Sequence, residues 1–272
     1  MELEQNSSRL KPLGLSVVGV SYDSPAVLKN FAERKAIHFA LLSDPDSEII
    51  RKLGLLNEAV PKGSPFFGIP HPGVFLLDGA GKVTAKYFEE DFRQRYTAAA
   101  ILMRQFGVET GAAREEVEGK RLTLTVSASN ATVSAGERIG LVIDMDLRPG
   151  LHVYAPGVQD YIPIAWTMKD AKGWTAHEVR YPAAEQLHLK AIDETVPAYQ
   201  GHVRLTREIT IADAGGLKAA ADASGTLTVE GSLRYQACDD TMCYIPETLP
   251  VVWRLKVETL DATRAPVELR RK

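Results

Sequence analysis

The sequence predicts two domains of different class, an α/β domain followed by an all-β sandwich. The 272-residue length exceeds the usual size of a single domain. Over about the first 107 residues, apolar segments with helical spacing alternate with short strand-like runs, which indicates an α/β sheet. Beyond about residue 119 the apolar period becomes two, and turns separate many short segments, which is typical of a sandwich.

Composition excludes several classes of protein. Lys plus Arg number 32 and Asp plus Glu 35, a net charge of -3 without a basic block, so we expect no nucleic-acid partner. No apolar run is long enough for a membrane-spanning helix, and the polar, acidic start does not resemble a secretory signal. Because no glycine-rich phosphate motif or metal-binding pattern is present, we expect no cofactor and no metal.

The first domain is assigned to residues 1–107. Ser24 and Pro25 predict an N-cap and the first position of a helix. Residues 73–77 and 82–88, joined by an Asp-Gly-Ala-Gly turn, predict an antiparallel hairpin at the edge of the sheet. The other expected elements are strands 15–20 and 38–42, a helix opened by Asp44 and Pro45, a proline-rich loop at 57–72 and a helix at 93–106.

A polar segment, residues 108–118, is interpreted as a linker to the sandwich, which is assigned to residues 119–258, and residues 259–272 as a mobile tail. The expected strands of the sandwich, and one short helical turn at 216–221, follow from period-two runs and glycine or proline turns. These strands are 122–126, 139–143, 174–181, 203–211, 227–235 and 249–257.

The two cysteines, Cys238 and Cys243, lie on a connection between strands. Facing residues of an antiparallel pair have Cα atoms about 4.5–5.5 Å apart, which suits a disulfide. Three interpretations stand. A structural staple closing so short a ring contributes only about 2 kcal/mol. A zinc site lacks ligands, since the nearest histidine is His202. We favour a redox dithiol that opens and closes.

Three segments of the first domain carry a family resemblance: Val-Ser-Tyr-Asp-Ser-Pro at 20–25, Leu-Ser-Asp-Pro at 42–45 and Pro-Gly-Val-Phe-Leu-Leu-Asp at 72–78. They resemble the redoxin branch of the AhpC/TSA peroxiredoxin family, which implies an incomplete thioredoxin-like fold that begins within its active-site helix. The resemblance also implies a cis peptide bond before Pro72. This half has no cysteine, so we expect no peroxidase activity from it. His38 and His71 are interpreted as structural or solvated.

A second resemblance rests on the run Tyr-Gln-Ala-Cys-Asp-Asp-Thr-Met-Cys-Tyr-Ile-Pro-Glu-Thr at 235–248, with Leu-His-Val-Tyr at 151–154, Tyr-Pro at 181–182 and Tyr-Gln-Gly at 199–201. It is similar to the N-terminal periplasmic domain of DsbD-type thiol:disulfide interchange proteins. The resemblance implies an immunoglobulin-like sandwich in which Cys238 and Cys243 exchange electrons with a thioredoxin-like or DsbD-type partner, Cys243 being the sulfur attacked. It also implies an extracytoplasmic location and contact between the two domains.

Neighbouring residues are expected to modulate the pair. The charges of Asp239 and Asp240 would raise the thiol pKa values, or else merely solvate the turn. Tyr235 and Tyr244 flank the cysteines. The family's aromatic cap corresponds to Val196–Tyr199, where Ala198 replaces the aromatic residue and Tyr199 would substitute. Two alternatives stay open: a non-catalytic binding or scaffold module with a structural disulfide, and a fragment of a peroxiredoxin-like antioxidant enzyme.

Overall fold

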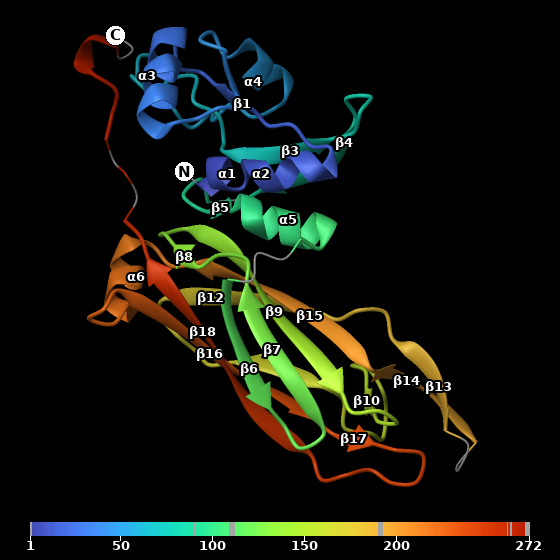
Figure 1. Ribbon diagram of the computed structural model, residues 1–272. Coiled ribbons are helices and arrows are strands. Elements are labelled where there is room, and N and C mark those ends of the chain that lie inside the picture. Colours follow the sequence, from blue (N-terminus) through green and yellow to red (C-terminus); the bar gives the residue numbers. More distant parts are fainter. Residues whose placement is uncertain are drawn as a thin grey trace. The chain divides into compact units, whose positions relative to one another are not determined.

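The computed structural model describes residues 2–89, 91–108, 112–189, 193–259, 261 and 263–269. The chain divides into two compact units (Figure 1). One comprises residues 1–98 with 260–272, and the other comprises residues 99–259. The first is an α/β unit and the second consists mostly of strands, as the sequence predicted.

The first unit alternates helices and strands in the predicted order. At the start of its longest helix, the Ser24 side chain accepts a hydrogen bond from the amide of Val27, and Pro25 occupies the first turn, so the predicted cap is confirmed. The elements are α1 (Glu2–Gln5), α2 (Ser7–Leu10), η1 (Lys11–Leu13), β1 (Val18–Ser21), α3 (Pro25–Lys35), β2 (Ala40–Ser43), α4 (Glu48–Lys52), β3 (Gly73–Leu77), β4 (Val83–Phe88) and β5 (Arg95–Tyr96).

The strands β1 and β2 form a parallel pair, and β3 and β4 form the predicted antiparallel hairpin. These two pairs are not hydrogen-bonded to each other, since no strand among the described residues joins them. The apolar run at residues 15–20 predicts a buried strand, but Val18 and Val20 of β1 are exposed.

The peptide bond before Pro72 is trans, because the described residues contain no cis peptide bond. The predicted cis bond is therefore wrong. Cis X-Pro bonds are favoured mainly in tight turns, and trans is intrinsically preferred by about 0.5–1 kcal/mol. Here the chain before Pro72 is extended and not tightly turned. The amide of His71 donates a hydrogen bond to Leu55 O, and Pro70 forms an isolated antiparallel β-bridge with Leu56.

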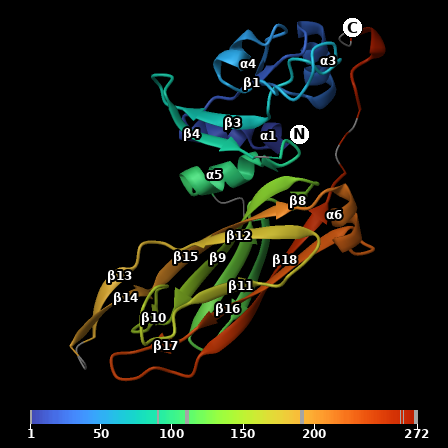
Figure 2. The ribbon, with the colours of Figure 1, turned by 180° about the vertical axis from the view of Figure 1, so that it is seen from behind.

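The second unit packs two large sheets face to face (Figure 2). One has the strand order β12-β15-β9-β7-β6 and the other β11-β16-β18-β8. The bounds of these strands are β6 (Ala112–Glu118), β7 (Leu122–Ala128), β8 (Thr132–Val133), β9 (Glu137–Leu147), β11 (Ala165–Met168), β12 (Trp174–Arg180), β15 (His202–Ile211), β16 (Thr226–Tyr235) and β18 (Glu247–Val257).

The core between these sheets follows from period-two alternation. On β18, Val251, Trp253 and Leu255 point inward and are completely buried, while the residues between them are more exposed. The Trp253 ring stacks on Trp166 with centroids 5.6 Å apart, and its indole nitrogen donates to Ser127 O. The predicted helical turn is α6 (Ala214–Ala220), whose N-cap Asp213 accepts from Gly216.

A third, smaller sheet of order β13-β14-β10-β17 carries the cysteine segment. Its strands are β10 (His152–Tyr154), β13 (Glu185–Leu189), β14 (Glu194–Gln200) and β17 (Ala237–Cys238). This sheet has a cluster of its own, made of Tyr154, Val196 and Cys238, separate from the main core. The site is therefore built on a distinct face of the strands.

Three segments differ from the sequence-based expectations. The predicted linker contains strand β6, which pairs with β7 over most of its length. The predicted helix at 93–106 is shorter, α5 (Ala98–Phe106), and nearly all of it belongs to the second unit. The predicted mobile tail contains the short helix η2 (Val267–Leu269), and its Asp261 forms ion pairs with Arg34 and Lys35 of α3.

Candidate functional site

Cys238 and Cys243 form a disulfide, with Cα atoms 4.0 Å apart. Cys238 ends the two-residue strand β17, and the two cysteines face each other in an isolated antiparallel bridge. The amide of Asp239 donates to Met242 O, and the amide of Tyr244 donates to Ala237 O, so backbone hydrogen bonds close the loop beside the disulfide. The predicted antiparallel facing of the two cysteines is confirmed, but their Cα atoms lie closer together than the expected separation of about 4.5–5.5 Å.

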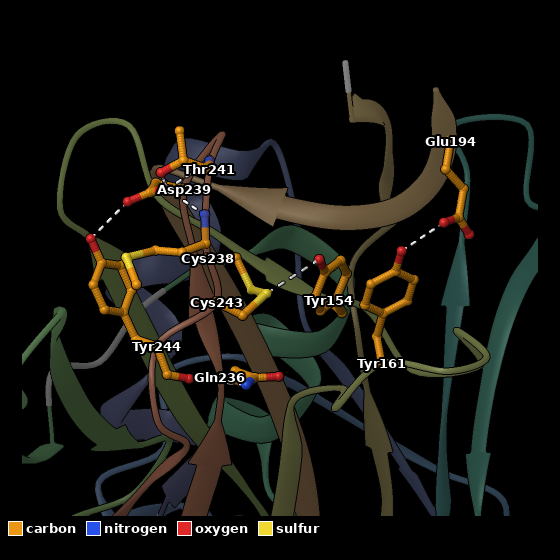
Figure 3. The surroundings of a disulfide bond; sticks show 10 residues. Tyr154, Tyr161, Glu194, Gln236, Cys238, Asp239, Thr241, Cys243 and Tyr244 are labelled. Carbon is orange, nitrogen blue, oxygen red and sulfur yellow. Dashed lines mark hydrogen bonds between the residues drawn. A yellow bond between two sulfur atoms is a disulfide. The ribbon is translucent and has the colours of Figure 1, made fainter. Parts of the chain in front are cut away.

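Asp239 shapes this loop. Its carboxylate accepts hydrogen bonds from the Tyr244 hydroxyl at 2.7 Å, from the amide and hydroxyl of Thr241, and from the amide of Met242 (Figure 3). These hydrogen bonds, that from Tyr244 foremost, hold the pKa of Asp239 well below its usual range. Asp240 is exposed. Asp239 thus holds the loop in place by accepting hydrogen bonds from backbone amides, the Thr241 hydroxyl and the Tyr244 hydroxyl.

The two sulfurs occupy different environments. Cys238 is only 1% exposed and packs with Tyr154 and Val196, whereas Cys243 is exposed. The Tyr154 hydroxyl lies 3.7 Å from the sulfur of Cys243. Of the two cysteine residues, Cys243 is thus the one that lies at the surface.

Aromatic side chains cover the buried side of the pair. The rings of Tyr154 and Tyr161 lie beside each other with centroids 4.3 Å apart, and the Tyr161 hydroxyl donates to Glu194 at 2.6 Å (Figure 3). That hydrogen bond raises the pKa of Tyr161 to about 12. Burial, with a further contribution from Glu194, raises the pKa of Tyr154, so its hydroxyl keeps its proton at neutral pH.

The predicted modulating residues have different locations. Tyr244 lies at the loop, where it donates to Asp239 and its ring contacts the Arg121 guanidinium at 4.0 Å. Tyr235 is buried in the main core and donates to Glu247. The structure does not place Tyr199 over the disulfide. It lies within strand β14, faces the main core and donates to Pro182 O, so the expected shielding by Tyr199 is wrong, while Val196 of the same stretch packs with Cys238.

Other residues of the site were not predicted as such. Tyr154 and His152 lie in the segment that carried the second resemblance, but no role was assigned to them. Their position on the cysteine face follows from strand register, since His152 pairs directly with Cys238 and with Gln200. Tyr161 and Glu194 gave no signal, because neither belongs to a motif. Among the described residues no group of three or more His, Cys, Asp or Glu could hold a metal ion.

Comparisons with known proteins assign the two halves of the chain separately. Residues 1–86 match the family model for the AhpC/TSA family, and residues 120–252 match the model for the N-terminal region of the thiol:disulfide interchange protein DsbD. The chain thus combines a region similar to the AhpC/TSA family with a sandwich similar to the N-terminal region of DsbD. Both predicted resemblances are confirmed, and with them the predicted fold classes.

Individual relatives match the first half. Peroxiredoxin Bcp of Escherichia coli K12 is 36% identical over 91 residues, which is 34% of this chain and 56% of that protein. The bcp protein of Haemophilus influenzae is 38% identical over 81 residues, 30% of this chain and 52% of that protein. The chain thus spans about half the length of these curated relatives.

Among solved structures, the N-terminal periplasmic domain of ScsB from Proteus mirabilis matches with 11% identity and a TM-score of 0.35, covering 53% of this chain and 51% of that one.

The two family-model matches and the cysteine pair at bonding distance support a thiol–disulfide redox function in general. No helix among the described residues is long and apolar enough to span a membrane.

Proposed function

We propose that the sandwich relays electrons by thiol–disulfide exchange through Cys238 and Cys243, with a thioredoxin-like or DsbD-type protein as its partner. The observation that carries the proposal is the unequal exposure of the two cysteine residues, since Cys243 is exposed and Cys238 is 1% exposed. A pair closed only for stability needs no accessible sulfur, and so short a ring contributes little stability.

The steps balance as a two-electron exchange. A partner thiolate attacks the sulfur of Cys243, the bond to Cys238 breaks, and the sulfur of Cys238 leaves as a thiolate that takes up a proton. The partner's second thiolate then attacks its own sulfur in the mixed disulfide and releases the thiolate of Cys243. The partner ends oxidised and this chain reduced, and the reverse sequence passes the electrons to a client disulfide.

Trapping of the mixed disulfide tests the proposal. With Cys238→Ser, we expect the thiol of Cys243 to form a stable mixed disulfide with a thioredoxin-like partner whose resolving cysteine is replaced by serine and whose remaining cysteine is supplied as its mixed disulfide with 5-thio-2-nitrobenzoate, which leaves as the thiolate. The matched control, Cys243→Ser, leaves only the buried sulfur and should trap little. Equal trapping by both variants, or none by either, would contradict the proposed order.

A redox titration separates the relay from a structural disulfide. A potential well below about -300 mV is typical of structural disulfides in secreted proteins, and such a value would favour the scaffold alternative. We expect a higher value, close enough to the potentials of thioredoxin-like proteins, about -270 to -120 mV, for exchange in both directions.

A further inference from the structure

His152 is a buried titratable residue that the exchange described above leaves without a role. It is 1% exposed, and its Nε2 atom has no hydrogen-bond partner among the described residues. Burying a polar atom without a partner costs free energy, so such atoms are rare in folded proteins and call for an explanation. The residue that faces His152 across the sheet is Cys238.

The register of the small sheet places His152 beside the buried cysteine. Strand β10 pairs with β17 in antiparallel fashion, and His152 is the direct partner of Cys238. Directly paired residues project from the same face with Cβ atoms about 4.5–5.5 Å apart. The His152 ring packs edge-on against Tyr154, at 5.3 Å between centroids, and Tyr154 belongs to the same cluster as Cys238.

Burial keeps the imidazole of His152 neutral, against the effect of the nearby carboxylates. Burial lowers the pKa of His152, and the carboxylates of Asp240 and Asp239 oppose that effect only in part. From β14, its direct partner is the uncharged Gln200. On its own strand Tyr154 stays protonated, because burial and the charge of Glu194 both raise its pKa. A neutral imidazole with a free nitrogen is a proton acceptor at physiological pH.

The inner sulfur needs such an acceptor. In the reduced chain, burial disfavours the thiolate of Cys238, yet only a thiolate can attack a disulfide. We infer that His152 is the general base that takes the proton from the Cys238 thiol when the pair closes. This inference rests on the proposed exchange and assigns the proton transfer within it.

Closure of the pair passes two electrons to the client disulfide. Cys243 is joined to a client sulfur in a mixed disulfide, and the Cys238 thiol gives its proton to Nε2 of His152. The sulfur of Cys238 attacks the sulfur of Cys243, the bond to the client breaks, and the client leaves as a thiolate. The imidazolium then returns its proton to solvent. Cys238 and Cys243 are oxidised to the disulfide, and the client disulfide is reduced.

A two-phase thiol assay on the reduced full chain tests the inference. Attack of Cys243 on 5,5′-dithiobis(2-nitrobenzoate) releases the first equivalent of coloured thiolate, and closure by Cys238 releases the second. With His152→Gln we expect the second phase to slow by about 100-fold, the low end of general-base effects, and the first phase to be unchanged. His202→Gln, an exposed histidine on β15, is the matched control and should behave as the unaltered chain.

The pH profile gives a readout that a purely structural role would not change. In the unaltered chain the second phase should rise through the pKa of the His152 imidazole, below its usual value of about 6.5, and NMR titration of that ring gives the value independently. In His152→Gln this inflection should be absent.

Each outcome has a distinct meaning. A second phase of unchanged rate and pH profile in His152→Gln would overturn the inference and leave the proposed exchange standing. Release of a single equivalent by the unaltered chain would mean that the pair does not close, which overturns the proposed function itself. If His152→Gln fails to fold, the profile of the unaltered chain decides, because a second phase without an inflection at the imidazole pKa excludes His152 as the base.

Discussion

Tyr154 should determine both the stability of the small sheet and the protection of the inner sulfur. It is 2% exposed and packs with Cys238 and Val196, so Tyr154→Ala removes a full aromatic side chain from a closed cluster. Truncating a buried aromatic residue to alanine costs about 3–5 kcal/mol. Tyr154→Phe removes only the hydroxyl, which lies 3.7 Å from the sulfur of Cys243, and should cost no more than about 1 kcal/mol.

Tryptophan fluorescence measures this loss in the sandwich alone, because all three tryptophans, Trp166, Trp174 and Trp253, belong to the second unit. A loss of 1 kcal/mol lowers Tm by about 2–4 °C in a unit of this size. We therefore expect Tm to fall by about 6–12 °C or more in Tyr154→Ala and by at most about 4 °C in Tyr154→Phe.

Alkylation of the reduced chain measures the protection. Iodoacetamide should modify Cys238 faster in Tyr154→Ala than in the unaltered chain, and at the original rate in Tyr154→Phe, because the ring and not the hydroxyl excludes the reagent. If Tyr154→Phe destabilises the sandwich as much as Tyr154→Ala, or if Tyr154→Ala leaves Cys238 unreactive, the reasoning from ring burial is refuted.

Three further predictions concern the loop and the sheets. The pKa of Asp239 is lowered in the folded chain, so its contribution to stability is present above the unfolded pKa of about 3.9 and is lost as pH falls toward the folded pKa. Urea midpoints measured from pH about 5 downward should therefore fall less steeply in Asp239→Asn than in the unaltered chain. Glu208→Gln should lower the free energy of unfolding by about 3–5 kcal/mol in urea titrations. The reason is that the Glu208 side chain is 7% exposed and forms ion pairs with Arg104 at 2.9 Å and Arg138 at 2.7 Å. A loss below about 1 kcal/mol would show that these ion pairs are screened like surface pairs. Gly231→Ala should cost about 1–3 kcal/mol by the same measurement, because its Cβ would lie 2.6 Å from the backbone oxygen of Thr167; an unchanged midpoint would mean that strand β11 shifts freely.

The large strands were predictable because each buries one face. Strands β9, β15, β16 and β18 carry period-two apolar runs, and this pattern is enough to place them in a sandwich. Strand β6 has the sequence Ala-Ala-Arg-Glu-Glu-Val-Glu, whose charges resemble those of a linker. It is nevertheless a strand at the sheet edge, where Ala113 and Val117 pack on the core and charged residues are tolerated.

The site was only partly predictable. The spacing of Cys238 and Cys243 indicated a disulfide, but the unequal exposure of the two sulfurs depends on residues far away in the sequence. Tyr154 lies 89 positions from Cys243, and Val196 comes from a strand that no pattern predicted. The cap was misplaced for a related reason: Val196–Tyr199 alternates between the cysteine face and the main core, and only strand register shows that Val196 belongs to the first and Tyr199 to the second.

The structure adds a second cause of thiol tuning to the one that the sequence suggested. The sequence suggested that Asp239 and Asp240 disfavour the thiolates by charge. Four hydrogen bonds keep the carboxylate of Asp239 ionised, and Asp240 is exposed. Burial of Cys238 also disfavours a thiolate, and it acts on that cysteine only. In the proposed exchange this difference imposes an order, because the exposed Cys243 meets the partner before the buried Cys238 can react.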